Sequence, residues 1–507
     1  MKFVIRHKIL LVVLVIYLAA VAGSVALNEL KRESLQFHTR DYPYFIEQAA
    51  RLADPRLSNR FALNIDGNNF LGLQGPEGVK GVYQAIHAEY FRYTYTLLYA
   101  LFHSVLPIYI FYCALFFLPL LYFAFLVQSN PGSWKQIGAY IALFLLFPGL
   151  VSAITLDLRP RMLFISAWTL FVLAVYYRRP FMEKLIFFGF LLFLREEGIL
   201  LGVALLIFDF IRTRRWKQSL VYLGLDLAAL AGFIAFMVWG GYTRIDVVYN
   251  PLNFAYVVGD AGPVLLAVIG GGTVLLAAVG VWIYRRRRGS FTNFLLLLSY
   301  GLGIAMTAYP ALRSDILTLA PLSASGSLTL LDGVARLLNE QTNWLLYYVV
   351  LLLPILLWDF MRGRWRRVWQ GFLVAIGAAS IAFTLIIVPP QVVGWKRLVE
   401  PARLVWDFKN SIDRYQTQVL VDYNTYQAFY DVENVYVYNR LPLWLVEPEN
   451  RYYPNNKIFL AGLIRQRIEY VVIARASLSD IHELVSLAGV NASEVASNAE
   501  YVVLKLR

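Results

Sequence analysis

Two aspartates and three arginines are the residues of this sequence best suited to chemistry. Asp41 follows the first long apolar run, and Asp157 lies in a very short segment between two later runs. Arg159, Arg161 and Arg195 are predicted at the same depth as these carboxylates. A carboxylate can take the proton of an attacking hydroxyl, and a guanidinium grips phosphate through two hydrogen bonds. The set predicts transfer chemistry with an anionic leaving group, although mutual salt bridges are an open alternative.

Three further residues are weaker candidates. Glu196 follows Arg195, and such adjacent charges are tolerated at membrane depth only near a water-filled cavity; a tight outer loop without function is the alternative. His87 and Glu89 lie two positions apart and could shape a substrate pocket. Two ligands are a weak signal for zinc, which takes three or four. No metal site and no cofactor are therefore predicted, although a divalent metal is compatible with this chemistry.

The composition indicates a membrane protein. Of the 507 residues, 59% are hydrophobic and 16% charged, whereas soluble domains carry about 25% charged residues. The net charge of +13 comes from short basic clusters between apolar runs. That arrangement is typical of membrane topology, so membrane lipids rather than nucleic acid are the expected partner. The lone Cys113 excludes a disulfide framework.

The apolar runs predict a multi-pass α-helical membrane protein with about eleven transmembrane helices. These are expected at 9–27, 106–127, 137–155, 162–177, 185–194, 198–210, 219–240, 263–284, 291–309, 344–360 and 371–389. If the N-terminus is cytoplasmic, the inner segments carry nineteen Lys and Arg, with Glu183 as their only acid. This asymmetry follows the positive-inside rule, and it predicts a plasma membrane protein whose C-terminal domain is extracytoplasmic.

Two regions are predicted outside the membrane. Within the transmembrane domain, 1–390, residues 28–95 form a long outer loop, in which apolar residues at helical spacing predict an amphipathic helix over Tyr42–Leu52. The tail, 391–507, is predicted as a soluble α/β domain, because strand-like runs alternate there with helical stretches. The predicted strands are Val419–Asp422, Val435–Tyr438, Tyr470–Ala474 and Tyr501–Leu506.

This layout resembles the GT-C class of membrane glycosyltransferases, a class that includes protein mannosyltransferases and aminoarabinose transferases. The shared features are an acid opening the long first loop, an acid after the third span, a short helix pair and an outer C-terminal domain. The resemblance implies a GT-C-like fold with Asp41 as general base and Asp157 as the second acid. It places Arg195 and Glu196 near the lipid phosphate. Relatives often carry paired acids in the first loop, whereas this chain has Asp41 alone.

The function implied by the resemblance is transfer of a sugar from a polyprenyl-phosphate donor to a glycan, lipid or protein acceptor at the outer face. The expected reaction is an in-line displacement that inverts the anomeric carbon. A transporter or flippase of lipid-linked substrate is one alternative, but transporters place ionisable residues near the bilayer midplane, often in two related halves. A non-catalytic membrane scaffold is the other.

Overall fold

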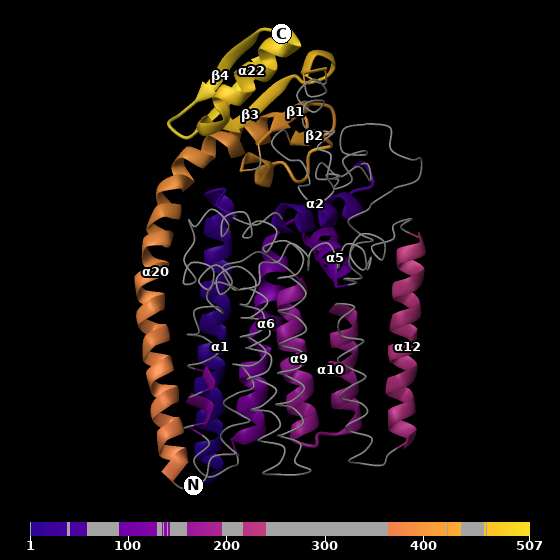
Figure 1. Cartoon of the computed structure of the whole chain (residues 1–507), viewed down its shortest axis with the longest axis vertical. Helices are drawn as coiled ribbons and strands as arrows, with labels where there is room; N and C mark the ends of the chain where they lie inside the picture. The colour runs from indigo at the N-terminus through magenta and orange to yellow at the C-terminus, as the bar shows by residue number, and fades with distance from the viewer. Residues whose placement is uncertain are drawn as a thin grey trace, which may run out of the picture.

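The computed structural model combines a layer of long helices with a small sheet at one end (Figure 1). It describes residues 2–37, 41–57, 91–128, 160–194, 216–239, 364–422, 424–437 and 464–507, with a few positions between 134 and 141 and at 461–462. The N-terminus lies at the end of the helical layer opposite the sheet (Figure 1). The N-terminus and the sheet therefore lie at opposite ends of the long axis of the molecule (Figure 1).

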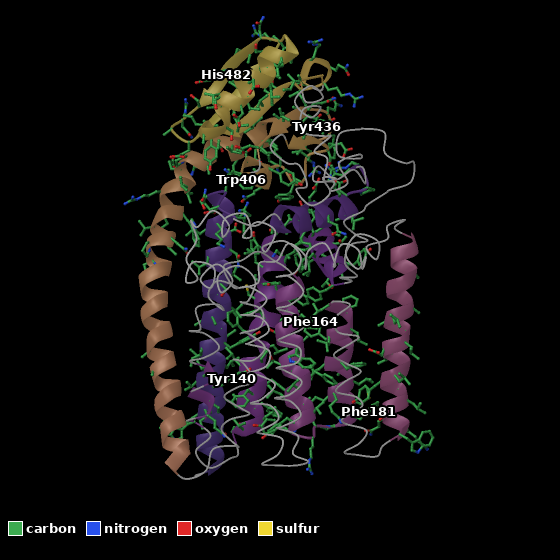
Figure 2. All side chains as sticks on the ribbon, viewed as in Figure 1. Tyr140, Phe164, Phe181, Trp406, Tyr436 and His482 are labelled. Atoms are coloured by element: carbon green, nitrogen blue, oxygen red, sulfur yellow. The ribbon has the colours of Figure 1, made fainter. Side chains whose placement is uncertain are left out.

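The described part of the helical layer is built around α6. Helix α6 (Leu106–Val127) packs against α1 (Lys2–Glu33) and α9 (Pro160–Tyr176). Helix α10 (Phe181–Leu194) packs against α9 on one side and α12 (Trp216–Trp239) on the other. The interfaces are apolar, and Figure 2 shows Phe164 within them. The buried Ser166 hydroxyl of α9 donates to the Phe116 carbonyl of α6 at 2.7 Å, so this polar group is hydrogen-bonded, as burial requires.

The prediction of a GT-C-like fold with about eleven transmembrane helices is wrong. Among the described residues, only two helices are long and apolar enough to cross a membrane, Lys8–Glu33 and Leu106–Val127, with mean hydropathies of 2.8 and 2.4. Helices α9 and α10 have 17 and 14 residues, fewer than the roughly 20 that a span needs. Helix α9 packs between α6 and α10 as a core element, and an apolar run buried in that way has the same composition as a span.

Several predicted spans lie outside the described residues. These are 198–210, 263–284, 291–309 and 344–360, together with most of 137–155. The run 371–389 is only part of the much longer helix α20 (Arg364–Ser411). At 48 residues, α20 is about 70 Å long, and it continues through the predicted domain boundary at 390 despite Pro389 and Pro390.

Helix α20 connects the far end of the helical layer to the sheet (Figure 1). Near its C-terminal end, the Trp406 indole donates to the Glu33 carbonyl at 3.3 Å, and Figure 2 shows this side chain just below the sheet. The Arg32 guanidinium lies 5.0 Å from the Trp406 ring, a favourable cation–π distance. The C-terminal end of α1 and that of α20 are thus fastened to each other.

The sheet has the strand order β2-β1-β3-β5-β4. Strands β1 (Gln418–Val421), β2 (Asn434–Val437) and β3 (Tyr470–Ala474) are parallel. Strand β5 (Tyr501–Leu506) is antiparallel to both β3 and β4 (Ala492–Ser497). The four predicted strands are confirmed to within one residue, whereas β4 was not predicted. Its sequence, Ala-Ser-Glu-Val-Ala-Ser, is mostly exposed and lacks the β-branched run that marks a strand.

Alternating side chains of the sheet enter two cores. Val419 and Val421 enter the same core as Ala402 and Val405 of α20. Leu420 enters a second core with Ile481 of α22 (Leu478–Ala488). This alternation follows from the two-residue period of a strand. At the end of β1, the buried Asp422 carboxylate accepts hydrogen bonds from the backbone and hydroxyl of Thr425, the Ala474 amide and the Ser477 hydroxyl. These bonds fix the 3-10 helix η2 (Thr425–Ala428).

Two short helices, α2 (Asp41–Ala53) and α5 (Arg92–Phe102), lie between the helical layer and the sheet (Figure 1). The amphipathic helix predicted over Tyr42–Leu52 is confirmed as α2. Its environment differs from the expectation, because Glu47 and Arg51 on its polar side are as buried as Phe45. Tyr426 of η2 and residues 432–433, just before β2, cover the face that the pattern predicts to be solvated.

Candidate functional site

The predicted catalytic and binding residues are only partly described. Asp41 is the first residue of α2, and Arg161 is the second residue of α9; both side chains lie outside the described part of the structure. Six other predicted site residues lie outside the described ranges: His87, Glu89, Asp157, Arg159, Arg195 and Glu196. The structure therefore neither joins nor separates the predicted set, and their shared cavity stays a prediction.

A backbone hydrogen bond between Phe91 and Phe193 connects the chain next to Glu89 with the chain next to Arg195. The Phe91 amide, two positions after Glu89, donates to the Phe193 carbonyl, two positions before Arg195, at 3.2 Å. The Phe91 ring also stacks on Phe111 of α6, with centroids 5.9 Å apart. The start of α5 and the end of α10 thus meet at one point on the sheet side of the helical layer.

A backbone clamp holds the chain just before α2. The Phe37 amide donates to Gln427 Oε1 at 3.1 Å, and Gln427 Nε2 donates to the Phe37 carbonyl at 3.0 Å. Both residues are buried, so these two bonds are shielded from competing water. Phe37 is four positions before Asp41. The clamp ties this part of the chain to η2 of the sheet domain, by which we mean the C-terminal end of α20 and the described residues that follow it.

A buried ion pair holds the middle of α2. Arg51 Nε donates to Glu47 Oε1 at 2.8 Å, and both side chains are 1% exposed. The second carboxylate oxygen of Glu47 accepts a hydrogen bond from the Tyr426 hydroxyl. The Arg51 guanidinium also donates to the Glu433 carboxylate at 2.9 Å and to the Val432 carbonyl at 3.0 Å. With so many bonds to one guanidinium, α2 can dock on the sheet domain in only one orientation.

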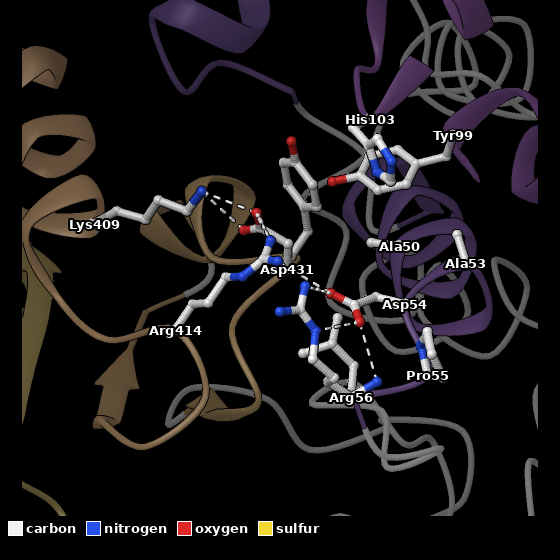
Figure 3. Close-up of a pocket in the computed structure, with 12 residues that line it drawn as sticks. Ala50, Ala53, Asp54, Pro55, Arg56, Tyr99, His103, Lys409, Arg414 and Asp431 are labelled. Atoms are coloured by element: carbon white, nitrogen blue, oxygen red, sulfur yellow. Dashed lines mark hydrogen bonds and ion pairs between the residues drawn. The ribbon is translucent and has the colours of Figure 1, made fainter. Parts of the chain in front are cut away.

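A polar cavity of about 610 Å³ lies where the C-terminal ends of α2 and α5 face the sheet domain (Figure 3). Asp54 and Arg56 line it from the end of α2, and Tyr99 and His103 from the end of α5. The sheet-domain side contributes Lys409, Arg414, Tyr430 and Asp431. Pockets that bind small ligands have volumes of about 300–1,000 Å³, so a small ligand would fit.

The two aspartates of this cavity are surrounded by cations. Arg56 Nε lies 3.0 Å from Asp54 Oδ1, and Arg414 Nη2 lies 3.1 Å from Asp54 Oδ2. Lys409 Nζ lies 3.0 Å from Asp431, which Arg414 also approaches at 3.8 Å. Arg414 thus divides its guanidinium between both carboxylates, and the cluster carries one more positive than negative charge.

The pKa values of two lining groups follow from these contacts. The hydrogen bond from Arg56, aided by the Tyr415 hydroxyl, holds the pKa of the Asp54 carboxyl far below its usual range. Burial, reinforced by the nearby Asp431 charge, raises the pKa of Tyr99 to about 12. At neutral pH the cavity therefore presents an ionised Asp54 and a protonated tyrosine hydroxyl.

The depressed pKa of Asp54 predicts acid sensitivity of this junction. A carboxyl whose pKa is lower in the folded state stabilises that state above its unfolded pKa, about 3.9, and loses this contribution as the pH falls further. We expect the melting temperature of the parent chain to fall more steeply below about pH 4 than that of Asp54→Asn. Scanning calorimetry of both proteins from neutral to acid pH measures the difference, and parallel curves would contradict it.

The described cavity residues were not predicted from the sequence. Asp54-Pro55-Arg56 reads locally as the turn that ends a helix, and Arg414 and Asp431 lie more than 350 positions later. A signal was present in the dense charge of 407–414, although charge alone is typical of a solvated helix end. In the described part of the chain, no three His, Cys, Asp or Glu side chains are grouped so as to hold a metal ion.

Comparison with known proteins does not place the chain in a family. No protein-family model matches it, and no curated protein matches it.

Proposed function

We propose that this chain is a membrane glycosyltransferase that transfers a sugar from a polyprenyl-phosphate donor to an acceptor at the outer face. The observation that carries the proposal is the position of Asp41, the first residue of a helix fixed by buried bonds between the helical layer and the sheet domain. A general base must be held rigidly to take a proton in the transition state. Helix α2 provides a rigid support next to this residue.

Membrane insertion is supported by the surface of α1. Leu11, Val12, Val15 and Leu18 are 54–61% exposed, and a continuous apolar surface of this kind is stable in lipid rather than in water. We propose that the chain lies in the plasma membrane and crosses it through α1 and α6 at least. The basic N-terminal end would be cytoplasmic, and the sheet domain, at the opposite end in Figure 1, would be extracytoplasmic.

The proposed reaction needs one base and one anion-binding group. Asp41 takes the proton of the acceptor hydroxyl, whose oxygen attacks the anomeric carbon as the bond from that carbon to the phosphate oxygen breaks. Asp157 is assigned as the second acid of the site. Arg159, Arg161 and Arg195, next to Glu196, stabilise the departing lipid phosphate, because charge-assisted hydrogen bonds favour the charge that develops there. His87 and Glu89 are assigned to the acceptor pocket.

A donor comparison tests this function. The purified full-length chain, reconstituted in liposomes, is incubated with membrane glycan extract and a panel of undecaprenyl-phosphate-linked hexoses and pentoses. We expect sugar transfer from at least one of these donors and none from the corresponding nucleotide sugars, because the proposed site opens to lipid. Transfer only from nucleotide sugars, or movement of the lipid-linked sugar across the bilayer without transfer, would overturn the proposal.

A further inference from the structure

The cavity between α2, α5 and the sheet domain is distinct from the proposed catalytic position. Asp54 follows the last residue of α2, whereas Asp41 is the first. A helix of 13 residues separates its ends by about 20 Å. A group bound beside Asp54 therefore cannot be the one that reacts at Asp41, although another part of the same ligand can reach it.

The charged lining of the cavity suits an anionic group. The Arg56 side chain is 66% exposed and that of Arg414 37% exposed, while Asp54 and Asp431, at 15% and 10%, lie deeper. The carboxylates thus hold the two guanidiniums from behind, and the cations form the accessible part of the charge cluster. An arginine held in this way loses little freedom when it binds a carboxylate or phosphate.

The opposite wall of the cavity suits a sugar ring. The rings of Tyr99 and Tyr430 meet edge to face, with centroids 6.3 Å apart, and His103 lies 6.5 Å from Tyr99. Figure 3 shows Tyr99 and His103 beside each other, on the side of the cavity away from Lys409, while Tyr430 lies next to the charges, with Lys409 Nζ 5.9 Å from its ring. Aromatic rings provide an apolar surface with a polar edge, and the hydroxyl of Tyr99 can donate and accept. A saccharide presents both an apolar ring face and hydroxyl groups.

His103 is held at this cavity in a strained backbone conformation. Its φ is 47°, in the left-handed region, where it ends α5 and its amide donates to the Tyr99 carbonyl at 2.7 Å. Glycine or asparagine adopts this conformation with less strain. The imidazole is thereby fixed at the end of α5, where it lines the cavity.

We propose that this cavity binds an anionic saccharide unit of the acceptor, at a distance from the reacting hydroxyl. The identification of this saccharide as part of the acceptor rests on the proposed function, whereas the binding of an anionic saccharide does not. Arg56 and Arg414 bind the carboxylate or phosphate, Tyr99 and His103 contact the sugar ring, and the cavity selects acceptors that carry a negative charge. It thereby sets the specificity of a transfer that takes place at the other end of α2.

Isothermal titration calorimetry on the full chain in lipid nanodiscs tests the cavity, with methyl glucuronide, methyl glucoside and inorganic phosphate as probes. We expect the glucuronide to bind at least tenfold more tightly than either other probe, because only it offers both a ring and a charge. Arg56→Gln should weaken glucuronide binding about tenfold, the effect of losing one charge-assisted hydrogen bond. His103→Asn should weaken binding of both saccharides while the backbone conformation is kept.

Two control variants match these changes outside the cavity. Arg178 has the same left-handed conformation, with φ of 53°, so Arg178→Asn should leave binding unchanged. Arg403 is a comparably exposed arginine, paired with Glu400 at 2.8 Å, so Arg403→Gln should also have no effect. Equal binding of glucuronide and glucoside, phosphate binding as tight as glucuronide binding, or unchanged affinity in both cavity variants would overturn the proposal.

A fifth variant separates this inference from the proposed function. Asp41→Asn should abolish transfer and leave glucuronide affinity unchanged. Should Asp41→Asn retain transfer while Arg56→Gln still loses the glucuronide, the catalytic assignment fails and the binding site stands. If glucuronide does not bind the parent chain, the binding site fails, whatever the activity.

Discussion

Replacing Asp41 by asparagine is expected to lower the rate of sugar transfer by about 100- to 10,000-fold, the usual contribution of a general base. Asparagine keeps the size of the side chain and a carbonyl oxygen but cannot take a proton. Since asparagine is also well tolerated at helix N-termini, the start of α2 should remain folded. The loss should appear in kcat more than in KM, measured with the purified chain and its lipid-linked donor.

Asp480 provides the matched control for this experiment. It is an exposed aspartate in the first turn of α22, within the sheet domain, so Asp480→Asn makes the same chemical change at another helix start. Its rate should equal that of the parent chain. If Asp41→Asn transfers sugar as fast as Asp480→Asn, Asp41 is not the base.

Replacing Arg51 by methionine is expected to lower the free energy of unfolding by about 3–5 kcal/mol, the cost of breaking a buried ion pair from one side. Glu47 would keep its bond to Tyr426 but lose its cation. Glu433 and the Val432 carbonyl would lose a donor as well. Chemical denaturation of the full chain, followed by tryptophan fluorescence, measures the loss.

The outcome for Arg51 can be checked against a less buried ion pair with the same spacing along a helix. Arg179 and Glu183 are also four positions apart, at 3.0 Å, but their side chains are 32% and 23% exposed. Arg179→Met should therefore lower the free energy of unfolding by less than about 1 kcal/mol. Adding Glu47→Gln to Arg51→Met should recover part of the loss, because the uncompensated charge is gone. Equal destabilisation by Arg51→Met and Arg179→Met would contradict a role for burial.

Arg51→Met and Asp41→Asn test two roles of helix α2. Arg51→Met acts on the docking of α2 against the sheet domain, and Asp41→Asn acts on the chemistry proposed for the start of that helix. Because the clamp between Phe37 and Gln427 also crosses this interface, Arg51→Met should slow transfer too, in proportion to the fraction of chains that undock.

Elements with a strong local pattern were predictable from the sequence. The β-branched runs Tyr470–Ala474 and Tyr501–Leu506 predict strands that the structure contains, because their side chains favour a pleated, half-buried surface. The helical spacing of Phe45 and Ala49 likewise predicts α2, and both residues are buried. In these segments the local preference of the backbone and the burial of one face agree.

Elements that depend on their neighbours were not predictable in the same way. Strand β4 exists because β5 offers it a hydrogen-bonding edge, and its own residues do not favour a strand. The eleven predicted spans were read from apolar composition, which does not distinguish a helix facing lipid from α9, a short helix buried between α6 and α10. Among the described helices, only α1 and α6 are both long and apolar enough to cross a membrane.

The candidate functional residues also differ in whether the sequence identifies them. Asp41 was identified from its residue type and its place after the first apolar run, both of which are local properties. The cavity of Asp54, His103 and Arg414 has no local signature, because its walls come from the ends of α2, α5 and α20. Charges separated by more than 300 positions meet there because α20 carries the sheet domain back over the first helices. A site of that kind exists only once the chain has folded.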